Sequence, residues 1–275
     1  GYNQLTSLDL SANTSLINLY CYDNSLTSLD VSANTALTYL DCGSNSLTSL
    51  DVSANTALTN LRCLYNQLST LDVSSNTALE YLTCQGNQFT SLNLSTNTAL
   101  VQLFCGHNQL TQLDLSNNPI LNRLHCYNNS LTSLDVSNNT ALIDMNCQDN
   151  QLTSLDVSAN TALRLLYCNN NQLIHLNMKN GVTENLTTFW ATNNSFDCIE
   201  VNAENVDWAT ANWTYANDNI DAGVEFSAVC VPEGYTYVPD NNFEQALIDL
   251  GYDDVLDDYV LTANISSVTS LSVSS

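Results

Sequence analysis

The chain has 275 residues, a net charge of −24 at neutral pH, and only four basic residues: Arg62, Arg123, Arg164 and Lys179. Such an acidic surface repels nucleic acids and anionic lipid headgroups, which excludes both as partners. No apolar run reaches the roughly 20 residues that a membrane-spanning helix needs, which argues against membrane insertion. Residues 181–275 carry 16 acidic and no basic side chains, against 12 and four in residues 1–180. This shift predicts a domain boundary near residue 180.

Residues 1–180 repeat with a period of 21. Each repeat has a cysteine half, such as Leu37–Asn45 (LTYLDCGSN), and a valine half, such as Leu47–Asn55 (LTSLDVSAN). Eight evenly spaced cysteines mark the period: Cys21, Cys42, Cys63, Cys84, Cys105, Cys126, Cys147 and Cys168. Self-similarity at a fixed period is the signature of a repeat architecture. Because residue 1 falls inside a repeat, we expect the sequence to be a segment of a longer protein.

The apolar spacing within each half predicts a short strand. In LxxLxC and LxxLxV, the last two apolar positions alternate with a polar one, as in a strand with one buried face. One repeat cannot bury its leucines alone, but stacked copies can, at about 4.8 Å per coil. The asparagine that ends each half can bond backbone groups of neighbouring coils. The sequence therefore predicts a β-rich solenoid of 21-residue coils, with parallel strands on one or both sides and little helix.

The phrase LTSLDVSANTALTYLDCGSN, at residues 26–45, resembles a known consensus. It is similar to the leucine-rich repeats of secreted Bacteroidetes proteins, in which units of 10 and 11 residues are nested. The likeness covers residues 1–180. It implies a secreted or cell-surface binding protein, often an adhesin, and it implies no particular ligand and no catalytic residues.

The two outward faces of the repeat differ in regularity. In the valine half, outward residues such as Thr48, Ser49 and Asp51 recur almost unchanged from coil to coil, whereas those of the cysteine half differ in every coil. Irregular aromatic and arginine side chains on a regular sheet suit recognition, because they give large contact areas and directed hydrogen bonds. The alternative is drift on an exposed sheet. The predicted ligand-binding residues are Tyr20, Tyr39, Arg62, Tyr81, Phe104, Arg123, His125, Arg164 and Tyr167.

The valine halves also carry a column of aspartates, namely Asp9, Asp30, Asp51, Asp72, Asp114, Asp135 and Asp156. Carboxylates about 5 Å apart repel each other unless hydroxyls or backbone amides offset the charge. We expect a hydrogen-bonded column. The alternatives are weak Ca²⁺ binding between coils and an ice-binding Thr/Ser plane.

The eight repeat cysteines take an apolar position of the pattern, so we expect free thiols buried in the core. Stacked copies about 4.8 Å apart are separated more widely than disulfide-bonded Cβ atoms usually are. The paired spacings typical of zinc ligands are absent.

Residues 181–231 are predicted to cap the end of the solenoid, because a bare end exposes core and sheet edge. Trp190, Trp208 and Trp213 are expected to cover the leucines of the last coil. The segments around Cys198 and Cys230 resemble the C-terminal caps of the same repeat family. This resemblance implies a disulfide between the two cysteines, and with it an oxidising compartment.

Residues 232–275 are predicted to be the N-terminal cap and first half-repeat of a following unit, which implies at least two such units in tandem. Residues 241–250 have the pattern of an amphipathic helix that ends at Gly251. Residues 268–275 return to the valine-half pattern. The nearby Asp253, Asp254, Asp257 and Asp258 are expected to form a solvated acidic turn, with a weak Ca²⁺ site as the alternative.

These features predict a non-catalytic protein without a cofactor. The histidines His107, His125 and His175 stand in different repeats without a paired nucleophile or acid, and there is no glycine-rich phosphate loop. We expect an extracellular or cell-surface recognition and adhesion module that binds a polysaccharide or a protein. The alternative is a structural spacer, or a stalk unit that self-associates in tandem or as a filament.

Overall fold

The computed structural model describes residues 2–231 and 234–269. The chain divides into two compact units, Gly1–Ala228 and Val229–Ser275, and each is described by itself. Every helix within the described residues is too short or too polar to span a membrane.

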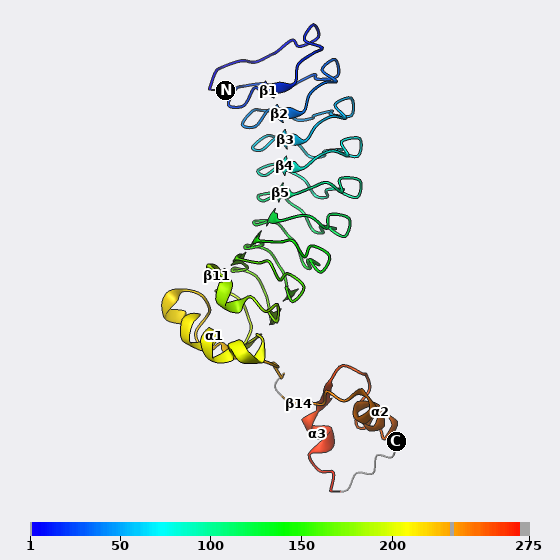
Figure 1. Cartoon of the computed structure of the whole chain (residues 1–275), viewed down its shortest axis with the longest axis vertical. Coiled ribbons are helices and arrows are strands. Elements are labelled where there is room, and N and C mark those ends of the chain that lie inside the picture. The colour runs from blue at the N-terminus through cyan, green and yellow to red at the C-terminus, as the bar shows by residue number, and fades with distance from the viewer. Residues whose placement is uncertain (1, 232–233, 270–275) are drawn as a thin grey trace. The chain divides into compact units, whose positions relative to one another are not determined.

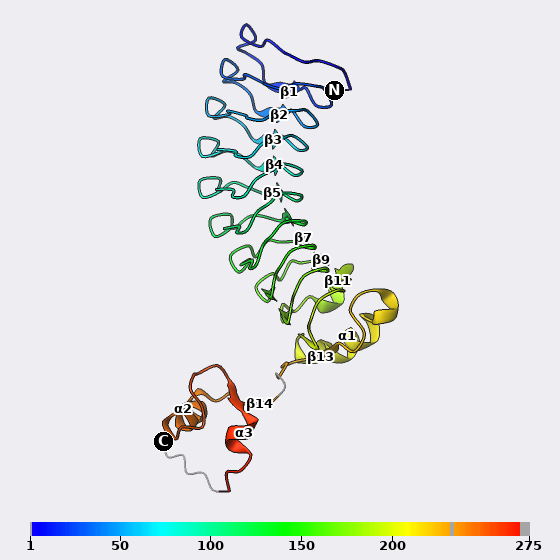
Figure 2. The ribbon, with the colours of Figure 1, turned by 180° about the vertical axis from the view of Figure 1, so that it is seen from behind.

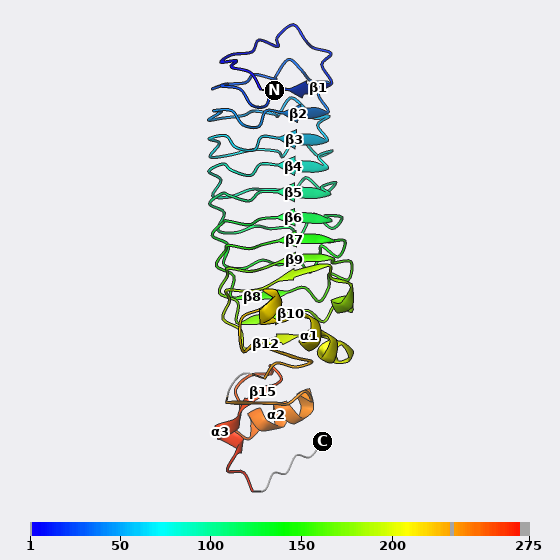
Figure 3. The ribbon, with the colours of Figure 1, turned by 90° about the vertical axis from the view of Figure 1, so that its left-hand side faces the viewer.

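The first unit is a stack of coils of about 21 residues, each of which contributes one strand to a parallel sheet (Figure 1). Strands β1 to β7 pair in sequence (Figure 3), and β9 and β11 complete the nine-stranded sheet (Figure 2). The strands are β1 Asn18–Tyr20, β2 Tyr39–Asp41, β3 Asn60–Arg62, β4 Tyr81–Thr83, β5 Gln102–Phe104, β6 Arg123–His125, β7 Asp144–Asn146, β9 Leu165–Tyr167 and β11 Thr188–Trp190. The predicted solenoid of parallel strands is confirmed.

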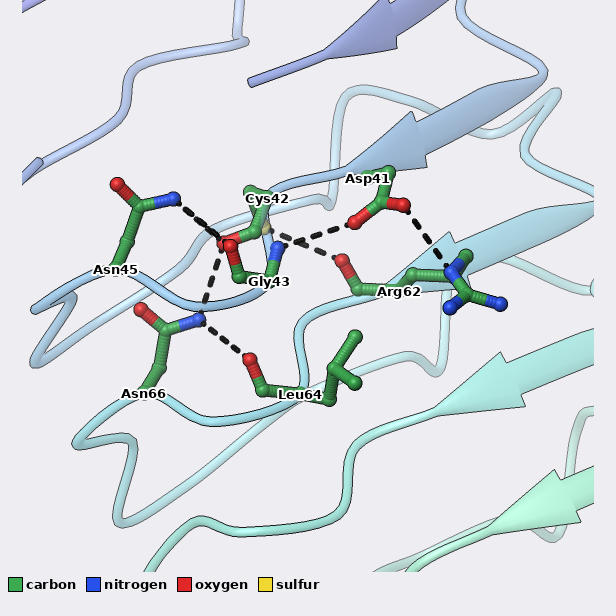
Figure 4. Close-up of polar contacts among 7 residues, drawn as sticks. All are labelled: Asp41, Cys42, Gly43, Asn45, Arg62, Leu64 and Asn66. Carbon is green, nitrogen blue, oxygen red and sulfur yellow. Dashed lines mark hydrogen bonds and ion pairs between the residues drawn. The ribbon is translucent and has the colours of Figure 1, made fainter. Parts of the chain in front are cut away.

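Backbone and asparagine hydrogen bonds join the coils on the cysteine side. The N–H of Cys42 donates to the carbonyl of Arg62 in the next coil at 2.9 Å, and the other coils repeat this contact. Nδ2 of Asn45 donates to the carbonyls of Cys42 and Cys21, both at 3.0 Å, and its Oδ1 accepts from the N–H of Leu26 at 3.0 Å. Figure 4 shows the next copy, Asn66, which donates in the same way to the carbonyl of Cys42 in the coil before it. Each asparagine therefore ties two coils together.

The valine halves form strands only at the C-terminal end of the described stack. There β8 Ser154–Asp156, β10 His175–Asn177, β12 Cys198–Glu200 and β13 Glu225–Ser227 make a second parallel sheet, in the order β13-β12-β10-β8. In the earlier coils a second asparagine column bridges the turns: Nδ2 of Asn55 donates to the carbonyls of Val31 at 3.0 Å and Asn34 at 2.9 Å. These turns splay farther apart than the strands (Figures 1 and 2). The nine-stranded sheet therefore lies on the inner side of the curve.

The core of the stack consists of leucines, with one cysteine per coil. The eight repeat cysteines are buried free thiols, as predicted. Burial raises the pKa of Cys63, Cys105 and Cys147 to about 12, so these thiols stay protonated at neutral pH. They act as small apolar side chains.

Short helices close the C-terminal end of the first unit: η1 Thr183–Asn185, η2 Ala203–Asn205, α1 Val206–Asn212 and η3 Tyr215–Asn217. Trp213 is buried and packs on Phe189 of the last coil, with ring centroids 4.4 Å apart, and Trp208 packs on Trp213 at 5.5 Å. The prediction that Trp190 also covers the core is wrong. Phe189 takes the leucine position, so the alternation of the strand turns Trp190 outward, where it is 47% exposed. Cys198 and Cys230 are both disulfide-bonded, in line with the prediction.

The second unit pairs β14 Tyr235–Tyr237 and β15 Tyr259–Leu261 as antiparallel strands. It also contains α2 Asn241–Asp249 and α3 Thr262–Ile265. Asp240 caps α2, because its Oδ1 accepts from the N–H groups of Asn242 and Phe243. Val238, Leu247 and Val260 form the small core. The half-repeat predicted at residues 268–275 lies mostly outside the described residues, since residues 270–275 are not among them.

Candidate ligand-binding surface

Strand register arranges the outward side chains of the nine-stranded sheet in two continuous rows. The first row is Asn18, Tyr39, Asn60, Tyr81, Gln102, Arg123, Asp144, Leu165 and Thr188. The second row is Tyr20, Asp41, Arg62, Thr83, Phe104, His125, Asn146, Tyr167 and Trp190. The buried leucines, and Met145 in β7, lie between the two rows and face the core.

Eight of the nine predicted ligand-binding residues fall in these rows. Tyr39, Tyr81 and Arg123 belong to the first row, and the other five belong to the second. Arg164 stands apart, since it precedes β9 and its Nη1 donates to the carbonyl of Leu163 at 2.8 Å. The structure therefore brings the predicted residues together along one sheet, with Arg164 beside it.

Charges on the surface are partly paired across neighbouring coils. Nε of Arg62 lies 3.1 Å from Oδ2 of Asp41, whose Oδ1 accepts from the N–H of Gly43 at 3.2 Å (Figure 4). Nε2 of His125 lies 3.2 Å from Oδ1 of Asp144. Both aspartates point outward yet are less than a tenth exposed. Partial burial and the neighbouring Asp41 raise the pKa of Tyr39.

Aromatic rings stack between adjacent coils along the rows. Tyr20 and Tyr39 have ring centroids 4.8 Å apart, and Phe104 stacks on His125 at 4.6 Å. Tyr167 meets Trp190 edge-on at 5.2 Å. Trp190 extends the second row beyond the predicted set. The signal was present in the sequence, because Phe189-Trp190-Ala191 matches Leu166-Tyr167-Cys168 of the preceding coil.

Three further aromatic residues, absent from the prediction, lie in the turn after the strands. Tyr127 follows β6, and its ring meets that of His107 edge-on at 5.0 Å. Tyr65 follows β3 and is 48% exposed. Together they extend the aromatic surface past the end of the strands.

The aspartates of the valine halves are held within their own turns. Oδ1 of Asp51 accepts from the N–H of Ser53 at 2.9 Å, and Oδ1 of Asp30 accepts from the hydroxyl of Ser32 at 2.6 Å. These bonds lower the pKa of both aspartates. The geometry agrees with a hydrogen-bonded column.

The aspartates after α2 also bond backbone groups of their own loop. Oδ1 of Asp253 accepts from the N–H of Asp254, and Oδ1 of Asp257 accepts from the N–H of Tyr259. Asp258 has a left-handed backbone, with φ of 67°. Within residues 2–231 and 234–269, no three His, Cys, Asp or Glu side chains are grouped to hold a metal ion.

Comparison with solved structures shows which proteins share this architecture. The functional domain of InlJ from Listeria monocytogenes, described as including a cysteine ladder, is 38% identical over 70% of this chain and 47% of its own, with a TM-score of 0.57. The leucine-rich-repeat protein LIC12759 of Leptospira interrogans is 26% identical over 72% of this chain and 54% of its own, with a TM-score of 0.66.

An internalin, InlF of Listeria monocytogenes, is 24% identical over 81% of this chain and 63% of its own, with a TM-score of 0.59, and it shows the fold alone. The chain thus spans less than two thirds of each of these three proteins. No family model and no curated protein matches the sequence. The chain has the leucine-rich-repeat solenoid fold, with bacterial internalin-like structures among its neighbours.

Proposed function

We propose that the chain is a non-catalytic recognition module that binds a protein or a polysaccharide through its nine-stranded sheet. The observation that carries this proposal is the contrast between the two sides of each coil. Irregular aromatic and arginine residues form two rows in register on the inner sheet, while the valine side repeats Thr, Ser and Asp. Solenoids use such extended concave surfaces for binding.

The ligand would meet Tyr81, Phe104 and Arg123 near the centre of the sheet. Tyr81 and Arg123 flank Gln102 in the first row, and Phe104 stands beside them in the second. Aromatic and arginine side chains supply most of the energy at binding hot spots. The disulfide-bonded Cys198 and Cys230 support an extracellular or cell-surface location, because disulfides persist in oxidising compartments.

The test uses ligands selected from a displayed peptide library and from a glycan array with the chain as bait. Replacing Tyr81, Phe104 and Arg123 together by alanine is expected to weaken binding of the selected ligands at least roughly tenfold. The matched control replaces Thr48, Ser49 and Thr70 of the valine side by alanine, and its affinity should be unchanged.

Equal affinity of both triple variants would refute the proposal. A spacer or stalk unit would instead select no saturable ligand and would self-associate. Sedimentation velocity at several concentrations separates that alternative from a monomeric binder.

A further inference from the structure

Five aromatic side chains gather where strands β3 to β6 run into their turns. We name Tyr65, Phe104, His107, His125 and Tyr127 the aromatic platform. Phe104 stacks on His125 at 4.6 Å, and Tyr127 meets His107 at 5.0 Å and His125 at 6.4 Å. Four of the five rings thus form a connected chain of contacts, and Tyr65 approaches Tyr127 from the other side.

Two glycines make room for the tyrosine rings. A Cβ atom added to Gly86 would lie 2.3 Å from Cδ1 of Tyr65, and one added to Gly106 would lie 2.7 Å from Cε1 of Tyr127. Gly86 follows Tyr65 by one repeat, and Gly106 precedes Tyr127 by one repeat. The two rings therefore lean toward each other over adjacent coils. Partial burial, together with the nearby Tyr65 phenol, raises the pKa of Tyr127.

Two platform residues have a left-handed backbone. Tyr65 and His107 have φ of 49° and 52° in the left-handed region. Tyr2 stands at the equivalent position of the first coil, and other coils place small or polar residues there: Asp23, Ser44, Gly86, Asn128, Asp149 and Asn170. This backbone is unfavourable for a bulky ring such as that of Tyr65, whereas His, Asn and Asp adopt it more readily. Strain of this kind is characteristic of functional sites.

The chemistry around the platform suits an uncharged partner rich in hydroxyl groups. Nε2 of Gln85 donates to the Tyr65 hydroxyl at 3.4 Å, so an uncharged amide group that can form hydrogen bonds lies beside the tyrosine ring. Arg62 is paired with Asp41 within the adjoining row. The net charge of −24 repels acidic polysaccharides. The rings of Tyr65 and Tyr127 lie over Gly86 and Gly106, whereas proline-rich peptides dock into grooves lined by aromatic side chains.

From these observations we propose that the aromatic platform binds a neutral glycan, whose sugar rings stack on Tyr65 and Tyr127. The electron-rich face of an aromatic ring attracts the C–H groups of a pyranose ring. The adjacent coils below the two tyrosines are about 4.8 Å apart, so consecutive sugars can meet consecutive rings. This inference rests on the proposed function, since the platform belongs to the same sheet.

The variants take their residues from equivalent positions in other coils. Tyr65→Asn introduces the residue found at Asn128 and Asn170, and Tyr127→Gln introduces the residue found at Gln148. Gly106→Ala keeps every aromatic residue but displaces the ring of Tyr127, because the added methyl group would lie 2.7 Å from Cε1 of that ring. Tyr22→Gln is the control, because Tyr22 follows its strand as Tyr127 does, lies outside the platform and both rows, and is replaced by the residue found at Gln148.

The probes are cellohexaose, laminarihexaose and mannohexaose, with hexagalacturonate and decaproline as comparisons, measured by isothermal titration calorimetry. At least one neutral hexasaccharide is expected to bind saturably. Tyr65→Asn with Tyr127→Gln should weaken that binding at least tenfold, Gly106→Ala several-fold, and Tyr22→Gln less than twofold. Thermal unfolding of each variant verifies that the solenoid is intact.

The inference fails if no neutral hexasaccharide binds, if the platform variants bind as the parent does, or if decaproline or hexagalacturonate binds better. Its failure is distinguishable from failure of the proposed function. If library-selected peptides still lose affinity for the Tyr81, Phe104 and Arg123 variant, the sheet is a recognition surface. Only the proposal that its ligand is a neutral glycan would then be refuted.

Discussion

At the scale of single residues, the aspartate column makes the stability of the fold depend on pH in the acidic range. The side-chain and backbone hydrogen bonds from Ser53 hold the pKa of Asp51 below its ordinary value of 3.8. A carboxyl whose pKa is lower in the folded state stabilises the fold above the unfolded value, and loses this effect as pH falls through the folded value. We therefore expect the unfolding temperature to fall as pH decreases below about 4.

Substitution of Asp51 separates the hydrogen bonds from the charge. Asn93 occupies the equivalent position one coil after Asp72, and its Oδ1 still accepts from the N–H of Ser95 at 3.1 Å. Asp51→Asn should therefore keep the neutral-pH unfolding temperature and flatten its acid dependence, whereas Asp51→Ala should lower it at neutral pH. Thermal unfolding by circular dichroism at pH 7 and pH 3 checks this, and identical curves for the two variants would contradict it.

At the scale of an element, the turns of the valine side depend on side-chain bonds. Nδ2 of the buried Asn76 donates to the carbonyls of Val52 at 3.0 Å and Asn55 at 2.8 Å. Asn76→Ala removes these two buried hydrogen bonds, while each carbonyl keeps its backbone partner, so we expect a loss of about 2 kcal/mol in the free energy of unfolding. Urea denaturation measures it. Ser75→Ala, in the exposed neighbouring position, should change stability little, and similar losses in both would show that the asparagine bonds do not hold the turn.

The sequence was sufficient to predict the coils but not where strands form on the valine side. Both halves share one pattern, yet the valine halves pair only from β8 onward. The turns spread apart on the outer side of the curve, so the earlier valine halves keep backbone bonds between coils near their start, such as the one from the N–H of Ser46 to the carbonyl of Leu26. The curvature is a property of the whole stack. Trp190 was misplaced for a related reason. The register pairs it with Tyr167, 23 residues earlier, so the 21-residue count no longer marks its position.

The sequence was likewise sufficient to predict the two rows of outward residues, but not the tyrosines in the turns. Outward rows follow from alternation, which is why Tyr39, Tyr81 and Phe104 were found. Tyr65 and Tyr127 were missed because their importance depends on what lies beneath them in another coil. The signal was nevertheless present: each tyrosine has a glycine one repeat away, on the side toward the other tyrosine.

At the scale of the whole molecule, the cysteine column offers a readout of how the stack unfolds. The thiolate is the reactive form, and a pKa of about 12 for Cys105 leaves almost none at pH 8. Burial and the nearby Asp41 raise the pKa of Cys21, at the end of the column, only to about 11. Because unfolded thiols ionise above about pH 9, the stability that these buried thiols contribute is lost as pH rises further.

Each coil contacts mainly its neighbours, so the stability of a solenoid is a sum of local terms, and unfolding can start at an end. Pulsed alkylation at pH 8 with increasing urea, followed by mass spectrometry, should label Cys21 at the lowest urea concentration. Cys105 and Cys126, in the middle of the column, should be labelled last. Simultaneous labelling of all eight would mean that the stack unfolds as one cooperative unit. That outcome would place more stability in the interfaces between coils than the short strands suggest, since only strong interfaces prevent fraying at the ends.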